Sequence, residues 1–134
     1  MNRYLRIIIA ISIFFTYNAC KIEGCTDNSA INYESKANEN DGSCLYEGSA
    51  IFWVDSNFEF NDITIIMNEN TIGIIDGFFT EEPECGVPHG VNITLEPGTY
   101  NFTAIDSLGG TWNSSILIEK NGCTAQQIIL DSLN

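Results

Sequence analysis

Apolar and polar residues alternate along the second part of the chain, in short stretches that turn residues separate. Val91, Ile93 and Leu95, for example, alternate with Asn92 and Thr94. Successive side chains of a β-strand point to opposite faces of a sheet, so this pattern predicts strands with one buried face. We expect seven strands, near residues 49–55, 62–67, 70–76, 89–96, 99–106, 112–120 and 123–131. This spacing is typical of an all-β fold, a small antiparallel β-sandwich.

Two connections between these strands carry turn signals. The segment Glu96–Thr99 has Pro97 and Gly98 at the central positions of a type II turn. Asn121 and Gly122 form a strong short-hairpin signal. Each signal predicts a tight reversal between two strands.

Aromatic side chains are expected to supply most of the bulk of the sandwich core. They are Trp53, Phe78, Tyr100, Phe102 and Trp112. Exposed aromatics that stack on carbohydrate are the alternative, but burial is favoured in so small a domain.

The first nineteen residues have the layout of an export signal. Arg3 and Arg6 give a positive start, and Ile7–Phe15 is an apolar run. A helix that spans a membrane needs about 20 apolar residues, so this run is too short to remain as an anchor. We expect residues 1–19 to be removed.

The residues before Cys20 resemble a bacterial lipobox, in which a small residue, here Ala19, precedes the cysteine that receives diacylglycerol. The resemblance implies a lipid on Cys20 and attachment to a bacterial outer membrane or cell surface. Ordinary secretion, with cleavage elsewhere and Cys20 left as a spare thiol, is the alternative.

The other four cysteines form an even set, which indicates disulfides and an oxidising compartment. We favour Cys25 with Cys44 and Cys85 with Cys123, because the first pair frames one compact polar segment and the second lies in the strand-rich region. Four cysteines allow three pairings, so the sequence leaves the connectivity open.

The segment 20–47, between the export signal and a β-sandwich domain at 48–134, is polar and loop-rich. It resembles a short module of exported Bacteroidetes proteins, a family often compared with calcium-binding thrombospondin type 3 repeats. The matching positions are Gly24, Cys25, Thr26, Asp27, Ala30, Asn32, Tyr33, Ala37, Asp41, Gly42, Ser43, Cys44 and Tyr46.

Calcium prefers six to eight oxygen ligands, and four side chains beside Gly42 offer such oxygens. They are Asp27, Asn38, Asn40 and Asp41. The EF-hand pattern does not fit, because Ala37 falls on its first position and Gly48 on its twelfth. A cluster of turn residues that cap backbone groups is the favoured interpretation, and calcium is the cofactor that remains open.

The segment Leu95–Ala104 resembles a hairpin of small transthyretin-like and PEGA-type sandwiches, in which a Pro-Gly turn precedes a core tyrosine. Those domains are usually accessory or binding modules of exported proteins. The resemblance therefore implies an architecture and a non-enzymatic role.

The chain is strongly acidic, with 18 Asp and Glu against 5 Lys and Arg and a formal charge of −13. Removal of the export signal would leave 3 basic and 18 acidic residues, a formal charge of −15. Such a chain repels nucleic-acid backbones, so nucleic acid is excluded as a partner.

Familiar catalytic motifs are missing from the sequence. It has no Gly-x-Ser-x-Gly elbow, phosphate loop or dinucleotide fingerprint. Cys85 and His89 lie four residues apart, but a zinc site would need two more ligands and would cost a disulfide. We therefore expect a non-enzymatic envelope lipoprotein that acts as an accessory or binding module, with an envelope protein or a glycan as its candidate partner. The alternatives are a calcium-stabilised adhesion or glycan-binding module and a hydrolase that uses carboxylates.

Overall fold

The computed structural model describes residues 20–55 and 62–129, and within these ranges the chain forms strands, turns and loops but no helix. The chain divides into two compact units, with the boundary between Cys44 and Leu45. The predicted export signal, residues 1–19, lies outside the described residues. The all-β prediction is confirmed.

The first unit is a small loop-rich module with two short strands, β1 (Glu23–Gly24) and β2 (Glu39–Asn40), which pair in parallel. A disulfide joins Cys25 to Cys44, as predicted. Cys25 and Ala30 are the buried apolar residues of its described part. Backbone hydrogen bonds and the disulfide, rather than a hydrophobic core, therefore hold this unit together.

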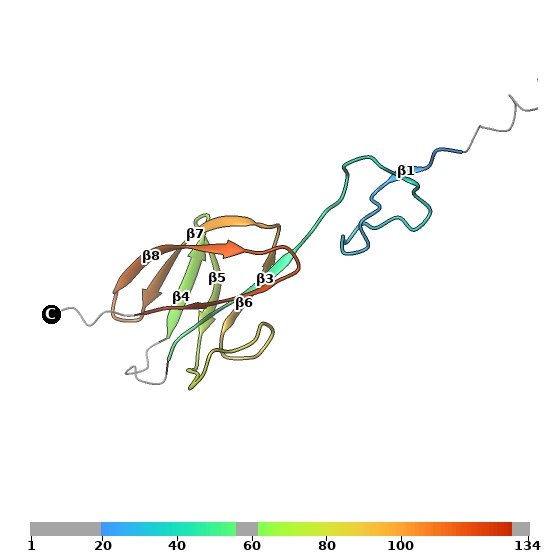
Figure 1. The fold of residues 1–134 in the computed structure, drawn as a ribbon. Helices are drawn as coiled ribbons and strands as arrows, with labels where there is room; N and C mark the ends of the chain where they lie inside the picture. Colours follow the sequence, from blue (N-terminus) through green and yellow to red (C-terminus); the bar gives the residue numbers. More distant parts are fainter. Residues whose placement is uncertain (1–19, 56–61, 130–134) are drawn as a thin grey trace, which may run out of the picture. The chain divides into compact units, whose positions relative to one another are not determined.

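The second unit is a β-sandwich of two sheets (Figure 1). One sheet has the strand order β6-β3-β9, and the other has the order β5-β4-β7-β8. The seven strands are β3 (Gly48–Trp53), β4 (Ile63–Met67), β5 (Asn70–Ile75), β6 (Val91–Leu95), β7 (Gly98–Asp106), β8 (Thr111–Ile118) and β9 (Cys123–Gln127). The predicted seven-stranded sandwich is thus confirmed, with small shifts at the strand ends.

One strand pair departs from the antiparallel prediction. β3 pairs with β6 in the antiparallel sense but with β9 in parallel, Ser49 lying opposite Cys123. The parallel pair arises because the chain leaves β8 in the four-stranded sheet and enters β9 in the other sheet. The turn at Asn121-Gly122 therefore joins the two sheets, and the hairpin expected there is wrong.

The Pro-Gly connection also crosses between sheets, since β6 and β7 belong to different ones. Gly98 is the first residue of β7 and does not have the positive φ that a type II turn requires. The predicted type II turn is therefore wrong. The hydroxyl of Tyr100 donates to the backbone oxygen of Glu96 at 3.0 Å, an arrangement like the tyrosine corner of other sandwiches.

The core between the two sheets is mainly aliphatic, with Phe52 and Phe102 in edge-to-face contact at its centre, 4.8 Å between ring centroids. Tyr100 and Trp112 are partly buried against it. Phe78 was expected in the core but is 54% exposed. It follows the end of β5 and lies in a connection, where strand alternation no longer decides which side chains face inward.

The connection between β5 and β6, residues 76–90, covers the outer face of the three-stranded sheet. Ile51 and Trp53 alternate with core residues of β3, yet both are buried. A Cβ on Gly90 would lie 2.6 Å from Ile51, and the Phe79 ring meets Trp53 edge-on, 6.4 Å between centroids. The predicted Cys85–Cys123 disulfide is confirmed and ties this connection to the first residue of β9.

Candidate functional site

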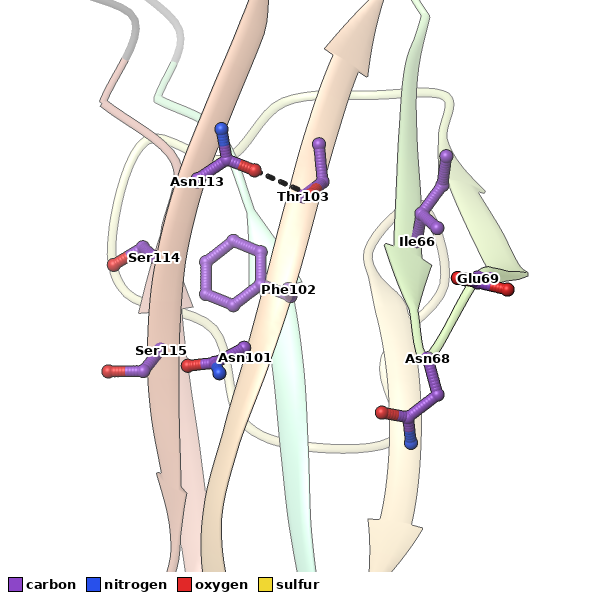
Figure 2. A pocket seen from close by; sticks show the side chains of 9 residues that line it. All are labelled: Ile66, Asn68, Glu69, Asn101, Phe102, Thr103, Asn113, Ser114 and Ser115. Carbon is purple, nitrogen blue, oxygen red and sulfur yellow. Dashed lines mark hydrogen bonds between the residues drawn. The ribbon is translucent and has the colours of Figure 1, made fainter.

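A shallow hollow of about 660 Å³ lies on the outer face of the four-stranded sheet (Figure 2). It lies over β4, β7 and β8 and reaches the turn between β4 and β5. The residues that line it are Ile66, Asn68, Glu69, Asn101, Phe102, Thr103, Asn113, Ser114 and Ser115.

Strand alternation places the polar side chains of this hollow. Phe102 points into the core, so its neighbours Asn101 and Thr103 point outward. The antiparallel register sets Thr103 opposite Asn113 and Asn101 opposite Ser115. Cross-strand pairs of this kind are close enough for their side chains to interact. Two strands thus present a compact group of amides and hydroxyls.

A cross-strand hydrogen bond orients part of this group. The Thr103 hydroxyl donates to Oδ1 of Asn113 at 2.7 Å, as Figure 2 shows. With Oδ1 so used, Nδ2 of Asn113 is the donor that this amide offers to a ligand. The oxygen of Thr103 keeps its lone pairs as acceptors. The pair therefore presents a donor and an acceptor beside each other.

The turn between β4 and β5 forms one rim of the hollow. Asn68 and Glu69 have positive φ angles of 49° and 64°, which L-residues rarely adopt. A type I′ hairpin turn requires a positive φ at both of its central residues. Asn adopts a positive φ readily, whereas Glu does not. The backbone oxygen of Asn68 accepts a hydrogen bond from Asn70 at 2.8 Å. This turn brings the carboxylate of Glu69 to the hollow.

Glu69 is the one charged residue among those that line the hollow. The other polar lining residues are amides and hydroxyls, although the whole chain carries a formal charge of −13. Charge is therefore concentrated elsewhere on this protein. On so acidic a chain, a face with few charged side chains differs from the rest of the surface.

The four side chains expected to bind calcium accept hydrogen bonds from nearby backbone N–H groups. Oδ1 of Asp27 accepts from Ser29 at 2.9 Å, and Oδ1 of Asn40 accepts from Gly42 at 3.0 Å. This is the capping of turns that the sequence favoured. Among the described residues, no group of three or more His, Cys, Asp or Glu is placed to hold one metal ion. Calcium binding stays the alternative prediction.

Asp41 belongs to the same cluster. Its Oδ1 accepts from the backbone N–H of Ser43 at 2.9 Å. Hydrogen bonds from the hydroxyl and the backbone N–H of Ser43 stabilise the ionised carboxyl and lower the pKa of Asp41 below its ordinary value of 3.8. Asp41 is exposed, so the ionised carboxylate has a structural role at the surface of the module.

Asn38 holds the chain on both sides of Lys21. Its Nδ2 donates to the backbone oxygen of Cys20, and its Oδ1 accepts from the backbone N–H of Ile22, both at 3.0 Å. The ammonium of Lys21 lies 2.9 Å from Glu23 and from Glu39. Cys20 is an exposed free thiol that directly adjoins this module.

The pair formed by Cys85 and His89 is not a metal site in the structure. Cys85 is in a disulfide, and His89 Nδ1 lies 3.1 Å from the carboxylate of Asp76. Both His89 and Asp76 are exposed. The sequence interpretation of this segment as a connection agrees with its position between β5 and β6.

Sequence reasoning did not find the hollow. Most of its residues were assigned to strands, and Asn68 and Glu69 lay between two predicted strands. No turn signal indicated that the strands which carry Asn101 and Asn113 would be neighbours. One signal was nevertheless present: no Lys, Arg, Asp or Glu occurs at the polar positions of 99–105 or 111–118 in this acidic chain. Uncharged outward positions on two strands mark a face that differs from the rest of the surface.

Comparison with known proteins found no family model, curated protein or solved structure that matches this chain. Within residues 20–55 and 62–129, no helix is long and apolar enough to cross a membrane.

Proposed function

We propose that this protein is a non-enzymatic binding module that a lipid on Cys20 attaches to the bacterial cell envelope. In this proposal the disulfide-closed module adjoins the anchor, and the β-sandwich binds the partner. The outer face of the four-stranded sheet is the binding surface.

The hollow on that face is the observation that carries the proposal. It gathers hydrogen-bonding side chains from β7, β8 and the turn between β4 and β5 on a rigid sheet. Polar groups on a rigid scaffold can bind a partner without a large loss of side-chain entropy. Catalysis would require an acid, a base or an activated nucleophile, and Glu69 is the one acidic or basic side chain in the lining.

Export is supported independently. The disulfides Cys25–Cys44 and Cys85–Cys123 indicate an oxidising, extracytoplasmic location. Attachment to the membrane is supported by the resemblance of the residues before Cys20 to a lipobox and by the place of Cys20 next to the predicted cleavage site. A single acyl chain gives weak binding, so stable attachment would need the two or more chains that a lipoprotein cysteine carries.

Cell fractionation of Cys20→Ala tests the anchor. We expect the variant in the soluble fraction, whereas the matched module variant Ser29→Ala stays with the membranes. Circular dichroism should show the same fold for both. Retention of Cys20→Ala in the membrane fraction, or an unmodified Cys20 in the native product by mass spectrometry, would contradict the anchor.

A broad hydrolase screen tests the non-enzymatic part. We expect no turnover above the blank. Turnover that one carboxylate substitution, such as Glu69→Gln, abolishes would replace this proposal with an enzyme.

A further inference from the structure

We propose that the hollow on the four-stranded sheet binds a neutral carbohydrate chain. This inference rests on the proposed function, because it names the ligand class of the same face. It depends on three properties of the described residues, namely the chemistry of the lining, its charge and its size.

The lining matches the hydrogen-bonding needs of a sugar. A sugar hydroxyl both donates and accepts, so it is best met by groups that do the same. Asn101, Asn113 and Ser115 are exposed and offer amide and hydroxyl groups side by side. The Thr103–Asn113 hydrogen bond holds one donor and one acceptor in fixed positions (Figure 2). Adjacent hydroxyls of a pyranose ring can pair with such a set.

The charge of the lining favours a neutral ligand. No Lys or Arg lines the hollow, so a phosphate, sulfate or uronate group would find no counter-charge. The overall charge of −13 adds long-range repulsion for anions. A cation would meet one carboxylate here, that of Glu69, and many more carboxylates elsewhere. A neutral ligand needs no counter-charge and is not repelled by the acidic chain. The Glu69 carboxylate can accept hydrogen bonds from the hydroxyls of such a ligand.

The size and shape fit a chain rather than one ring. A volume of about 660 Å³ lies within the range of about 300 to 1,000 Å³ that is usual for ligand sites. The hollow is open to solvent and follows the exposed face of β7 and β8. Partly buried Ile66 supplies an apolar patch on which the C–H face of a sugar can rest.

A protein partner is the rival occupant. Stable protein interfaces bury about 800 Å² on each partner and depend on buried aromatic or Arg residues at their centre. The lining offers no exposed aromatic, since the ring of Phe102 lies in the core. The observations therefore favour the carbohydrate.

Titration of the purified full-length protein with linear hexasaccharides tests this inference. The neutral probes are hexamers of glucose, mannose, xylose and N-acetylglucosamine, and the charged comparators are hexagalacturonate and a chitosan hexamer. Calorimetry gives the affinity, and NMR shift changes give the location. We expect at least one neutral hexamer to bind, with shifts centred on Asn101 and Asn113, and both charged comparators to bind at least tenfold more weakly.

Variants of the face provide the decisive comparison. The double variant Asn101→Ala with Asn113→Ala should weaken binding at least tenfold. Asn113→Asp keeps the size of the side chain but removes its donor, so it should also weaken binding and serves if the double variant does not fold. Thr94→Ala is the matched control, because it breaks a similar cross-strand contact, to Ser49, on the other sheet. It should change the affinity by less than twofold.

Three outcomes would overturn the inference: no neutral hexamer binds, the charged comparators bind equally well, or the face variants behave like Thr94→Ala. Failure of the proposed function is separable. If no hexamer binds but an envelope protein cross-links through positions 101 and 113 of this face, the carbohydrate is wrong and the binding module stands. If neither binds, and Cys20→Ala remains with the membranes, both proposals fail.

Discussion

The hydroxyl of Tyr100 donates a hydrogen bond to the backbone oxygen of Glu96, four residues earlier, at the point where the chain passes between the two sheets. The bond holds the connection between β6 and β7 to the first residues of β7, with Tyr100 packed against the core. Short bonds of this type contribute about 0.5 to 1.5 kcal/mol to stability.

Tyr100→Phe removes this bond and keeps the ring. We expect it to lower the free energy of unfolding by about 1 kcal/mol, since the carbonyl of Glu96 loses its partner. Urea denaturation with fluorescence detection measures the change. Tyr33→Phe, at an exposed position of the other unit, is the control and should have no effect on the sandwich. Equal stability of Tyr100→Phe and the unmodified protein would contradict the structural role.

The two disulfides should stabilise different units. Cys85 and Cys123 lie 38 positions apart in sequence, so loss of their bond should destabilise the sandwich by about 4 kcal/mol in the chain-entropy model. Cys85→Ala with Cys123→Ala should also free the 76–90 connection and expose Trp53, which shifts its emission to longer wavelength. Cys25→Ala with Cys44→Ala should unfold the module and leave the sandwich transition unchanged. A sandwich that loses stability in the second variant would contradict this division.

Two glycines in the sandwich should respond differently to Ala. A Cβ at Gly90 would meet Ile51 at 2.6 Å, so Gly90→Ala should cost about 1 to 3 kcal/mol through overpacking. Gly98 begins β7 without a positive φ, and a Cβ there would lie no closer than 3.5 Å to its nearest neighbour, Tyr100. Gly98→Ala should therefore change stability by less than about 0.5 kcal/mol. A large loss of stability in Gly98→Ala would contradict this backbone conformation and support the predicted type II turn.

The strands and turns of the sandwich differ in how well the sequence predicts them. Alternation predicted seven strands and the inward position of Phe102 because burial of every second residue leaves a local signature. Turn residues at 97–98 and 121–122 predicted where the chain reverses. They carried no information on which sheet the next strand joins, because packing between distant strands decides this. Phe78 was misplaced for a related reason, since the connection that follows β5 has no period.

The candidate site was hidden for the same reason. Asn101 and Asn113 were each predictable as polar positions of a strand, but their proximity depends on the register of β7 with β8. That register follows from the turn in which Oδ1 of Asp106 accepts from Leu108 and Gly110. A single polar residue carries no sign of its partner on the next strand.

Asp41 should make the module sensitive to acid. Its pKa is lowered in the folded state by the hydrogen bonds from Ser43, so the ionised form is favoured by folding. This stabilisation is fully present above the ordinary value of 3.8 and is lost as the pH falls through the lower folded value. NMR titration of the Asp41 carboxyl should give a pKa below 3.8, and Ser43→Ala should raise it. Ser29→Ala should leave the Asp41 titration unchanged, and a normal pKa in the unmodified protein would contradict the role of Ser43.

Calcium should have no effect on the thermal stability of the module. Oδ1 of Asp27, Asn40 and Asp41 each accepts a hydrogen bond from the backbone N–H two residues later, so these three side chains stabilise turns. Asn38 bonds the distant backbone of Cys20 and Ile22, so all four side chains already have a structural role. A ligand that binds only the folded state raises stability in proportion to RT ln(1 + [L]/Kd), so millimolar calcium would reveal even a weak site. The melting temperature of the module, followed by NMR in calcium and in EDTA, should therefore be equal. Asp27→Ala with Asp41→Ala should lower it by the same amount in both buffers, because caps are lost. A rise with calcium that this double variant abolishes would instead establish the calcium site.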